Sequence, residues 1–425
     1  MTNSIIEKLL NGAEVEWKPL GEVCEFRNGF AFKSNLFKEE GLPIIRITNI
    51  DGKNINLSDV KYFNSSDYDS DLLPYEVNKG DILLAMSGAT TGKIGFYGFE
   101  ITAYLNQRVG KFIPDKKVLN NKFLYHFLLS KAEDLYIMAG GGVQPNLSSN
   151  KLLKDLIIPI PPLEIQQKIV KILDKFTELE ATLEAELALR KKQYQYYRET
   201  LLTFPQDLDR GGYNEITKAL YHNTPVVFKT LGEMGELIRG NGLQKKDFTE
   251  TGVPAIHYGQ IYTYYGTETD KTISFVTPEL AVKLRKVNHG DVVITNTSEN
   301  LDDVGKALLY LGEEQAVTGG HATIFRPNED ILGKYFVYLT QTQFFFNEKR
   351  KLAKGTKVID VSANDMSKIT VPIPSLSEQQ KIVNILDKFD SLTNSITEGL
   401  PKEIELRRKQ YEYYREKLLD FPRNS

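Results

Sequence analysis

The chain has 425 residues, with 53 basic and 56 acidic side chains and a formal net charge of −3 at pH 7. This length allows two or three domains, and the charge balance excludes an overall basic character, so any nucleic-acid-binding surface must be local. One cysteine, and five histidines without metal-ligand spacing, exclude a disulfide framework and a cysteine-based zinc site. The N-terminal sequence has no signal-peptide shape and no apolar run approaches the ~18 residues of a membrane helix, so we expect a cytoplasmic protein.

Residues 1–158 have the pattern of a globular domain. Short β-rich runs at 44–47, 82–85 and 109–113 lie among Gly, Asn, Asp and Ser turns. Residues 120–138 carry apolar side chains at helical spacing. A polar loop, GGGVQPNLSS, then leads through a short strand into the next region. We therefore expect a domain that mixes strands and helix.

Residues 159–205 are predicted to form one long helix. Apolar residues recur at steps of four and three from Ile165 to Leu183, with Leu179 on this stripe, and the pattern resumes at Leu187 after one four-residue insertion. Pro161 and Pro162 permit only a first helical turn, and Pro205 stops the helix. The pattern also fits the core face of an ordinary amphipathic helix.

The rest of the chain repeats this plan. Residues 206–371 contain a linker with one short helical piece (206–225) and a second domain, with β-rich runs at 253–258, 292–295 and 322–325 and a helical stretch at 331–352. Residues 372–425 form the second helical region. Its first block, PIPSLSEQQKIVNILDKF, matches PIPPLEIQQKIVKILDKF (159–176) at 14 of 18 positions, and LRRKQYEYYREKLLDFP matches LRKKQYQYYRETLLTFP. A repeat with such long spacing indicates a duplicated domain-plus-helix unit.

The predicted fold class is therefore α+β. We expect two pseudo-symmetric domains of mixed strands and helices, separated by two long antiparallel helices that form a coiled coil. Ser375 with Glu378 fits a capping box at the start of the second helical region. Gly399-Leu400-Pro401 predicts that one helix ends and another begins there.

No motif in the chain is specific for catalysis. Ser87 to Lys93 resembles a phosphate-binding loop, but only three residues separate its glycines and Ile94 stands where a magnesium-binding Ser or Thr is needed. A Gly-Lys turn at a strand end is the better interpretation. A methyltransferase would need a glycine-rich cofactor loop and an Asn/Asp-Pro-Pro-aromatic motif, and neither is present. We expect no catalytic residues, no cofactor and no metal site.

Polar and basic side chains concentrate in the loops of both domains, and such side chains suit base edges and phosphates. For any one of them, an ordinary solvated loop residue remains the alternative. The candidate DNA-binding residues are Arg27, Asn28, Lys33, Arg46, Thr90, Thr91, Lys93, Gln107, Arg108, Gln144, Asn146, Arg239, Asn241, Lys245, Lys246, His257, Gln260, Asn300, His321, Lys354 and Lys357.

Two tyrosine-rich segments, YQYYR from Tyr194 and YEYYR from Tyr411, cover more than one helix face. Tyr194 and Tyr197 lie on the apolar stripe, whereas Tyr196 does not. Exposed aromatic residues beside arginine are typical of protein interfaces. Packing against the adjacent domain explains them equally well.

Several segments together resemble the specificity subunit of type I restriction-modification systems. They are the twin PIPPLEIQQKI and PIPSLSEQQKI segments, the twin RKKQYQYYRE and RRKQYEYYRE segments, the K-x-LGE entries to each domain, and GGGVQPNLS. TELEATLEAEL (177–187) resembles the IC subgroup of that family. The resemblance covers the whole chain. It implies two target-recognition domains, each reading one half of a split DNA site, and no catalysis by the subunit itself.

The resemblance also implies partners: double-stranded DNA, two adenine methyltransferase subunits and, through them, restriction and translocase subunits. In this family the helical regions carry the subunit contacts. The candidate partner-binding residues are Gln166, Gln167, Arg190, Gln193, Tyr194 and Tyr197, with Gln379, Gln380, Arg407, Gln410, Tyr411 and Tyr414 as the second set.

Two other functions remain open from the sequence. One is a coiled-coil scaffold or adaptor that does not bind DNA. The other is the recognition part of a fused methyltransferase or nuclease, against which the missing cofactor motif argues.

Overall fold

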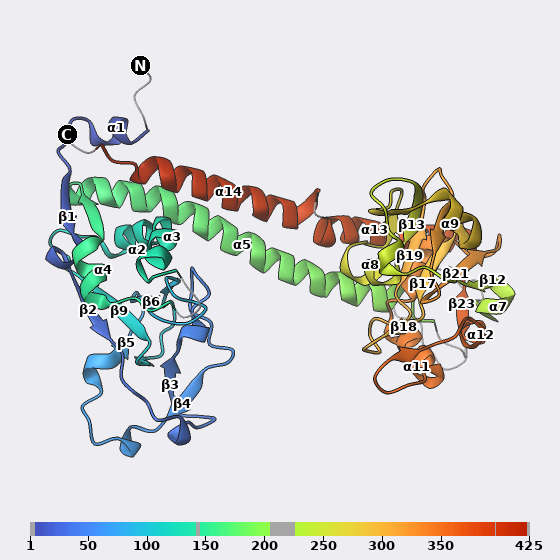
Figure 1. Cartoon of the computed structure of the whole chain (residues 1–425), viewed down its shortest axis with the longest axis horizontal. Coiled ribbons are helices and arrows are strands. Elements are labelled where there is room, and N and C mark those ends of the chain that lie inside the picture. Colours follow the sequence, from blue (N-terminus) through green and yellow to red (C-terminus); the bar gives the residue numbers. More distant parts are fainter. Residues whose placement is uncertain (1–4, 142–144, 205–225, 396, 423–425) are drawn as a thin grey trace. The chain divides into compact units, whose positions relative to one another are not determined.

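The computed structural model describes residues 5–141, 145–204, 226–395 and 397–422. The chain separates into two compact units (Figure 1). Unit 1 contains residues 1–182 and 404–425, and unit 2 contains residues 183–403. The short helical piece expected in the linker 206–225 lies outside the described residues.

The described strands of unit 1 form three small sheets. β1 (Glu16–Pro19) pairs antiparallel with β10 (Ile157–Ile160). The second sheet has the order β2-β9-β6-β7 and the third has the order β4-β3-β8-β5. Their strands are β2 (Cys24–Asn28), β3 (Leu42–Ile45), β4 (Lys61–Phe63), β5 (Glu76–Val77), β6 (Ile82–Ala85), β7 (Ile94–Phe96), β8 (Ala103–Leu105) and β9 (Val109–Pro114).

Short helices connect and cover these strands. The α-helices of the first domain are α1 (Ile5–Leu10), α2 (Asn121–Ser130), α3 (Ala132–Met138) and α4 (Ser149–Asp155). The 3₁₀ helices are η1 (Leu20–Glu22), η2 (Ser34–Leu36), η3 (Ile47–Asn49), η4 (Ser65–Asp67) and η5 (Leu73–Tyr75). The sequence predicted a single helix over 120–138, but a break at Lys131 divides it into α2 and α3.

Unit 2 repeats the same three sheets and adds short strands. β11 pairs with β23, β12-β21-β17-β19-β14 form the second sheet, β15-β13-β20-β16 form the third, and β18 pairs with β22. The strands are β11 (Val227–Thr230), β12 (Gly235–Arg239), β13 (Val253–Ile256), β14 (Glu268–Thr269), β15 (Ser274–Val276), β16 (Arg285–Val287), β17 (Val292–Thr295), β18 (Thr297–Ser298), β19 (Ala307–Tyr310), β20 (Ala316–Thr318), β21 (Ala322–Pro327), β22 (Ile359–Asp360) and β23 (Thr370–Ile373).

The helices of the second domain also follow the first. They are α7 (Leu231–Met234), η7 (Lys245–Asp247), α8 (Tyr258–Thr263), α9 (Pro278–Lys283), α10 (Gly333–Leu339), α11 (Gln343–Leu352) and α12 (Ala363–Met366). The helix expected over 331–352 is divided into α10 and α11, and the Thr342 side chain caps the second of these. Both predicted domain helices were therefore too long, because helical spacing continues across a tight turn.

Strand registers show that the two domains are copies of one fold. Glu16 pairs with Ile160 in the first domain, and Val227 pairs with Ile373 at the matching place in the second. Each third sheet contains one parallel pair among antiparallel ones: β3 with β8, and β13 with β20. The predicted fold class, two matching domains of mixed strands and helices with long helices, is confirmed.

Three long helices follow the domains. They are α5 (Leu163–Leu201), α13 (Leu376–Asn394) and α14 (Gly399–Leu419). The predicted capping box is present, with Ser375 Oγ bonded to the Glu378 carboxylate and to the Glu378 amide. Gly399 adopts φ +75°, and a Cβ there would lie 2.4 Å from the carbonyl oxygen of Ser391, so the break between α13 and α14 requires glycine. Within the described ranges, no helix combines the length and apolarity needed to cross a membrane.

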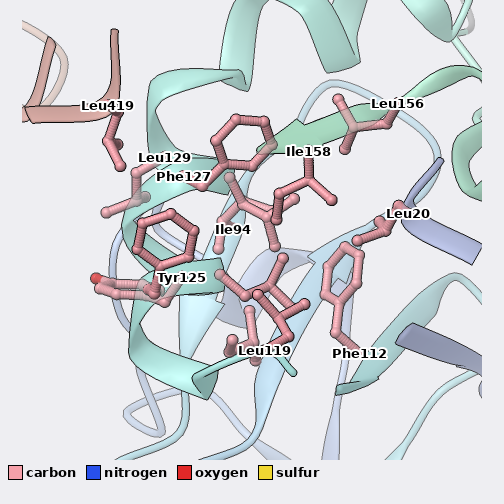
Figure 2. Close-up of a cluster of buried hydrophobic side chains, with 14 of the residues drawn as sticks. Leu20, Ile94, Phe112, Leu119, Tyr125, Phe127, Leu129, Leu156, Ile158 and Leu419 are labelled. Atoms are coloured by element: carbon pink, nitrogen blue, oxygen red, sulfur yellow. The ribbon is translucent and has the colours of Figure 1, made fainter. Parts of the chain in front are cut away.

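Each domain core is completed by the end of a long helix. In unit 1, Leu418 and Leu419 at the end of α14, and Phe421 just after it, join the cluster formed by the sheet and α2. Figure 2 shows Leu419 beside this cluster. In unit 2, the residues at the end of α5, Leu201, Leu202 and Phe204, join the matching cluster. Burying these apolar side chains fixes the helix end against its domain.

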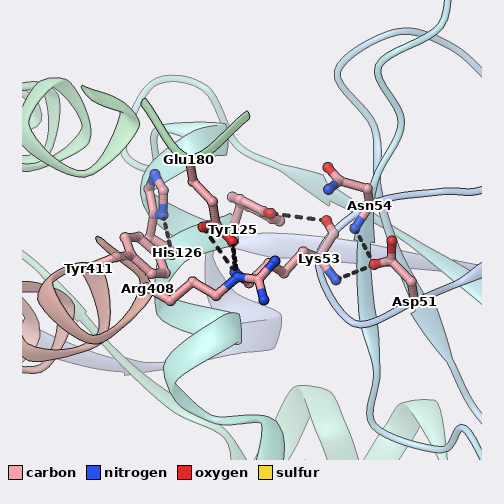
Figure 3. Close-up of polar contacts among 8 residues, drawn as sticks. All are labelled: Asp51, Lys53, Asn54, Tyr125, His126, Glu180, Arg408 and Tyr411. Atoms are coloured by element: carbon pink, nitrogen blue, oxygen red, sulfur yellow. Dashed lines mark hydrogen bonds and ion pairs between the residues drawn. The ribbon is translucent and has the colours of Figure 1, made fainter. Parts of the chain in front are cut away.

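The two long helices of unit 1 run antiparallel. Phe176 of α5 stacks on Tyr414 of α14 at 5.2 Å between ring centroids, and Glu180, further along α5, binds Arg408, earlier on α14. Figure 3 shows the Glu180 carboxylate between Arg408 and Lys53. The Lys53 ammonium donates to this carboxylate at 3.1 Å. The predicted apolar stripe included Leu179, but this side chain is 39% exposed and the neighbouring Glu180 faces inward. Glu180 faces inward because its carboxylate binds both Arg408 of α14 and Lys53 of the first domain.

A buried glutamine anchors each long helix to its domain. Gln166 Nε2 donates to the carbonyls of Val118 and Pro161, at 2.9 and 2.8 Å, and Gln166 Oε1 accepts from the Asn120 amide at 2.8 Å. Gln379 makes the same three bonds, to the carbonyls of Asp330 and Pro374 and from the Leu332 amide. Each glutamine satisfies three main-chain groups that no secondary structure reaches.

We predict that Gln166→Leu lowers the free energy of unfolding by about 3 kcal/mol or more, because it leaves buried main-chain donors and acceptors unpaired at a cost of roughly 1–3 kcal/mol each. The matched control is Gln167→Leu, whose side chain is exposed. Chemical denaturation of both variants tests this. Equal stability of the two variants would show that the Gln166 bonds contribute nothing.

Among the described residues, the junction between domain and helices carries a histidine in unit 1 and a tyrosine at the matching place in unit 2. His126 of α2 is fully buried, with Nε2 3.0 Å from Asp174 Oδ1 of α5 and Nδ1 2.9 Å from the Tyr411 hydroxyl of α14. A carboxylate can only accept, so His126 Nε2–H donates to Asp174 and Nδ1 accepts from Tyr411. At the matching place in unit 2, the Tyr338 hydroxyl donates to Asp387 at 2.5 Å.

Burial lowers the pKa of His126, although Asp174 opposes this effect. Lys122 and Arg415 lower the pKa further. The pKa of Asp174 is also lowered: burial raises it, but hydrogen bonds from His126 and Lys122 outweigh burial. The native junction therefore holds a neutral imidazole beside an ionised carboxylate.

We predict that unit 1 loses stability as the pH falls below about 6.5, the ordinary pKa of histidine. The unfolded chain takes up a proton there that native His126 does not, so the free energy of unfolding decreases by up to about 1.4 kcal/mol for each unit by which the pKa is lowered. The measurement is the melting temperature of wild type and His126→Gln between pH 7.5 and 5.5. The melting temperature of wild type should fall more between pH 7.5 and 5.5 than that of the variant. Parallel curves would contradict the prediction.

Candidate nucleic-acid interface

The loops of the first domain meet at one end of its main sheet. β2 and β6 end there, and β9 and β7 begin there, since Asn28 pairs with Gly110, Ala85 with Val109 and Leu84 with Ile94. The third sheet joins the same end, because the Asn106 amide donates to the Ile45 carbonyl and the Phe30 amide to the Leu105 carbonyl. We call this end, in each domain, the loop edge.

Most of the candidate residues of the first domain lie on its loop edge. Arg27 and Asn28 end β2, Lys93 precedes β7, and Gln107 and Arg108 precede β9; all five side chains are exposed. Arg27, Lys93 and Arg108 have no ion pair with another described residue. Cationic side chains in this state are available to an anionic partner.

The remaining candidates of the first domain differ in their positions and contacts. Arg46 follows β3 at the loop edge and pairs with Asp59, 3.6 Å away. Asn146 is exposed and forms a β-bridge with Ser87, which places it beside the β6–β7 loop. Lys33 lies in the loop after β2, exposed. Gln144 lies outside the described residues.

The Gly-Lys turn before β7 is held by its own threonines. Thr91 is buried and its hydroxyl donates to the carbonyls of Gly88 and Pro145, while the Thr90 hydroxyl donates to the Ile47 carbonyl. These hydroxyl groups shape the loop. Thr91 is therefore a support for the edge, and Lys93 is the exposed group.

The second domain presents the same edge with different side chains. Arg239 ends β12, His321 precedes β21 and His257 follows β13. The corresponding residues of the first domain are Asn28, Arg108 and Arg46. The loop between β17 and β19 spans residues 296–306, whereas the loop between β6 and β7 spans only 86–93. The scaffold is thus repeated and its exposed chemistry is not.

Contacts among these residues tie the second edge together. The His321 ring lies 2.8 Å from the Thr297 hydroxyl and 4.9 Å from the Tyr258 ring. Arg239 bonds to the Gly320 carbonyl and pairs with Asp360 at 3.3 Å. Burial, His321 and Lys245 lower the pKa of His257. A neutral imidazole there offers both a donor and an acceptor.

The other candidates of the second domain surround this edge. Gln260 is half-buried and bonds to Ser274 Oγ, and Asn300 caps its own loop by bonding to Asp303. Lys354 pairs with Asp365 at 2.9 Å. The exposed candidates in nearby loops are Asn241, Lys245, Lys246 and Lys357.

The structure separates the candidate partner-binding residues into internal and external groups. Gln166 and Gln379, which we expected on a partner surface, are buried and use their amides inside their own units, so they do not reach a partner. Tyr194 and Tyr411 are also buried. Their burial agrees with the alternative that these tyrosines pack within the protein. Tyr197 stacks on Phe389 in unit 2 as Tyr414 stacks on Phe176 in unit 1.

The outward-facing candidates make matching local bonds. Arg190 donates to Gln193 Oε1 at 2.9 Å, and Arg407 donates to Gln410 Oε1 at the same distance. Gln167 and Gln380 are exposed at matching positions near the starts of α5 and α13.

The structure also exposes apolar residues that sequence reasoning did not select. On α5, Leu189 is 66% exposed and Tyr196 58%; on α14, Leu406 is 50% exposed and Tyr413 54%. Each pair is spaced by seven residues, so its two members lie on the same helix face. We call these pairs the Leu-Tyr patches. The signal was present in the sequence, because Tyr196 lies off the apolar stripe.

No group of three or more His, Cys, Asp or Glu side chains in the described ranges is placed to hold a metal ion.

Comparison with known proteins gives one consistent result. The family model described as "Type I restriction modification DNA specificity domain" matches residues 13–189 and 223–406. The chain is 32% identical to the specificity subunit of the Escherichia coli type I restriction enzyme EcoR124I/EcoR124II, over 99% of this chain and 98% of that protein. It is 30% identical to a putative type I restriction enzyme specificity subunit of Haemophilus influenzae, over 98% of each.

Solved structures share the fold. A chain from a structure titled for complex assembly and conformational transition of the type I R-M system matches with a TM-score of 0.60 at 16% identity, covering 95% of this chain and 97% of that one. The crystal structure of a type I S subunit from M. genitalium matches with a TM-score of 0.55 at 19% identity, covering 98% of each chain. The family match over both halves, the full-length relatives and the shared fold together show that this chain belongs to the family of non-catalytic specificity subunits of type I restriction-modification systems.

Proposed function

We propose that this chain reads a bipartite double-stranded DNA target, with one half-site for each domain, and docks the methyltransferase and restriction subunits of its complex. In this proposal residues 1–158 and 206–371 hold the recognition domains, and residues 159–205 and 372–425 hold the helical regions. The protein acts where the DNA is, in the cytoplasm. The observation that carries the proposal is one scaffold present twice with unlike side chains at its loop edges.

The chemistry of the loop edges supports DNA as the ligand. Arg27, Lys93 and Arg108 are exposed cations that can contact phosphates, and an arginine can also bind guanine through two hydrogen bonds. Asn28 has the amide group that pairs with adenine. Replacement of Asn28 by Arg239, and of Arg108 by His321, in the second copy changes the pattern of donors and acceptors. Two copies with different patterns read different base sequences.

Duplication of the helical surface supports two copies of one partner. The Leu-Tyr patch on α5 and the patch on α14 have the same residues at the same spacing, and each lies beside an Arg-Gln pair, Arg190 with Gln193 and Arg407 with Gln410. Exposed tyrosine and arginine side chains are typical of interface centres. We assign each patch to one adenine methyltransferase subunit, through which the restriction subunits join.

We predict that Lys245→Ala with Lys246→Ala weakens binding of the assembled methyltransferase complex to its target. Removing one lysine–phosphate interaction reduces the slope of log K against log salt by roughly 0.9. Affinity is measured from 50 to 200 mM salt on a duplex whose site is first mapped from methylated genomic DNA. Discrimination at the first half-site should stay unchanged.

The matched control for this pair is Lys116→Ala with Lys117→Ala. These two lysines are exposed and follow β9, at the end of the first domain's sheet opposite its loop edge. The control removes the same charge from a place that the proposal keeps away from DNA. If both pairs change the slope equally, the effect is one of net charge. If wild type binds a scrambled duplex as well as its site, the chain is a scaffold and the proposal fails.

We predict that Leu189→Ser with Tyr196→Ser removes one methyltransferase subunit from the complex, because the α14 patch is left intact. Light scattering of the purified complex gives the stoichiometry, which should fall from two copies to one. Ala188→Ser with Gln195→Ser is the control, since both residues are exposed with the same spacing on α5. Melting temperatures should match wild type, and an unchanged stoichiometry would remove this patch from the interface.

A further inference from the structure

A lysine is buried beneath the loop between β17 and β19 at the second loop edge. Lys349 of α11 is 4% exposed, and its ammonium donates to the main-chain carbonyls of Val304 and Asp302, at 2.5 and 3.2 Å. Its stem packs against Gly305, where a Cβ would lie 3.2 Å from Lys349 Cδ. The Phe346 ring lies 5.1 Å from the ammonium. Lys349 therefore fixes the returning arm of the loop 296–306.

The ammonium of Lys349 has carbonyl partners and, among the described residues, no carboxylate within ion-pair distance. The nearby Asp303 pairs instead with Lys306 at 2.7 Å. Burial lowers the pKa of Lys349 to about 8, with Asp302 and Asp303 opposing and Lys306 adding to the shift. Burying a cation without a carboxylate destabilises a fold. The ammonium is held by main-chain carbonyls of the loop, so the lysine serves the loop rather than the apolar core.

The loop that Lys349 holds carries polar groups of the loop edge. Asn300 lies at its tip, and β18 within it pairs with β22, whose Asp360 binds Arg239. Two further bonds shape its base: the Gly305 amide donates to the Thr295 carbonyl, and the Thr295 hydroxyl donates to the Asp303 carbonyl. Lys349 is thus the one α11 side chain that donates to this loop among the hydrogen bonds of the described residues.

The first domain fixes its shorter loop differently. Gly92 packs directly on the backbone of α3, where a Cβ would lie 3.1 Å from the Tyr136 nitrogen. In the first domain the Thr91 hydroxyl donates to main-chain carbonyls. In the second domain the Lys349 ammonium has this role. A loop with three more residues stands further from its supporting helix, and a long side chain with a charged end spans that gap.

We propose that Lys349 is a positioning residue for recognition of the second half-site: by holding the carbonyls of residues 302 and 304, it sets the conformation in which the 296–306 loop meets DNA. This inference rests on the proposed function. Lys349 does not touch the DNA itself. Its replacement should therefore relax base discrimination at one half-site while general DNA affinity is kept.

The test uses Lys349→Met, which keeps the length of the side chain, in the complete methyltransferase complex. Affinity is measured for the mapped target and for duplexes with a base pair changed in either half-site. Discrimination at the second half-site should fall about tenfold, the equivalent of ~1.4 kcal/mol of base contact. Discrimination at the first half-site should stay at the wild-type level. The control is Lys351→Met, an exposed lysine on the same helix that pairs with Glu348.

Two further measurements distinguish positioning from a general structural role. Hydrogen exchange at the Gly305 and Lys306 amides should accelerate in Lys349→Met, while amides of residues 85–93 stay unchanged. The stability of wild type relative to the variant should rise between pH 8 and 10.5, since the unfolded chain keeps a proton that native Lys349 releases. Unchanged hydrogen exchange at Gly305 and Lys306 would show that the loop does not depend on Lys349, which would overturn the inference.

The outcomes separate the two proposals. If wild type itself shows no half-site discrimination, the proposed function fails. If wild type discriminates and Lys349→Met discriminates equally at the second half-site, the inference about Lys349 fails alone. If both half-sites lose discrimination together, Lys349 acts on the whole fold and the positioning role is also overturned.

Discussion

The structure depends on how each domain core is closed. The first domain contributes a sheet and α2, but the apolar surface between them is sealed by Leu418, Leu419 and Phe421 from the end of α14. The second is sealed by Leu201, Leu202 and Phe204 from the end of α5. Each of these helices begins in one unit and ends in the other. Neither core is complete without a helix that follows the other domain, so folding of the two copies is coupled through the helices.

The polar groups of the junctions make this closure specific. Apolar burial alone would allow a helix to slide or rotate by one turn. Gln166 and Gln379 prevent this at the start of their helices, because each can satisfy its three main-chain groups in only one position. Further along the helices, the His126, Asp174 and Tyr411 group in unit 1 and the Tyr338 and Asp387 pair in unit 2 act in the same way. Because the closure is so constrained, the loop edges can vary without disturbing it.

Variation at the loop edges is where the two copies differ in function. The strands below them keep their registers, whereas the side chains that end β2 and β12, and those that precede β9 and β21, change between copies. The longer loop of the second domain needed a new support, and Lys349 provides it at a cost in stability. The proposed recognition function follows from this division between a fixed frame and a variable edge.

The sequence by itself determined the duplication, the fold class, the long helices and the approximate positions of three strands in each domain. These follow from local patterns, such as the repeated PIP-x-L-x-x-QQKI block and the Ser375 and Glu378 cap, which need no knowledge of distant residues. Only the tertiary structure decided what the polar residues do. Gln166 and Gln167 are neighbours of the same type, yet one is buried and one exposed, and Glu180 replaced Leu179 on the inner face. Burial depends on which segments from far along the chain pack together, and no local pattern records that.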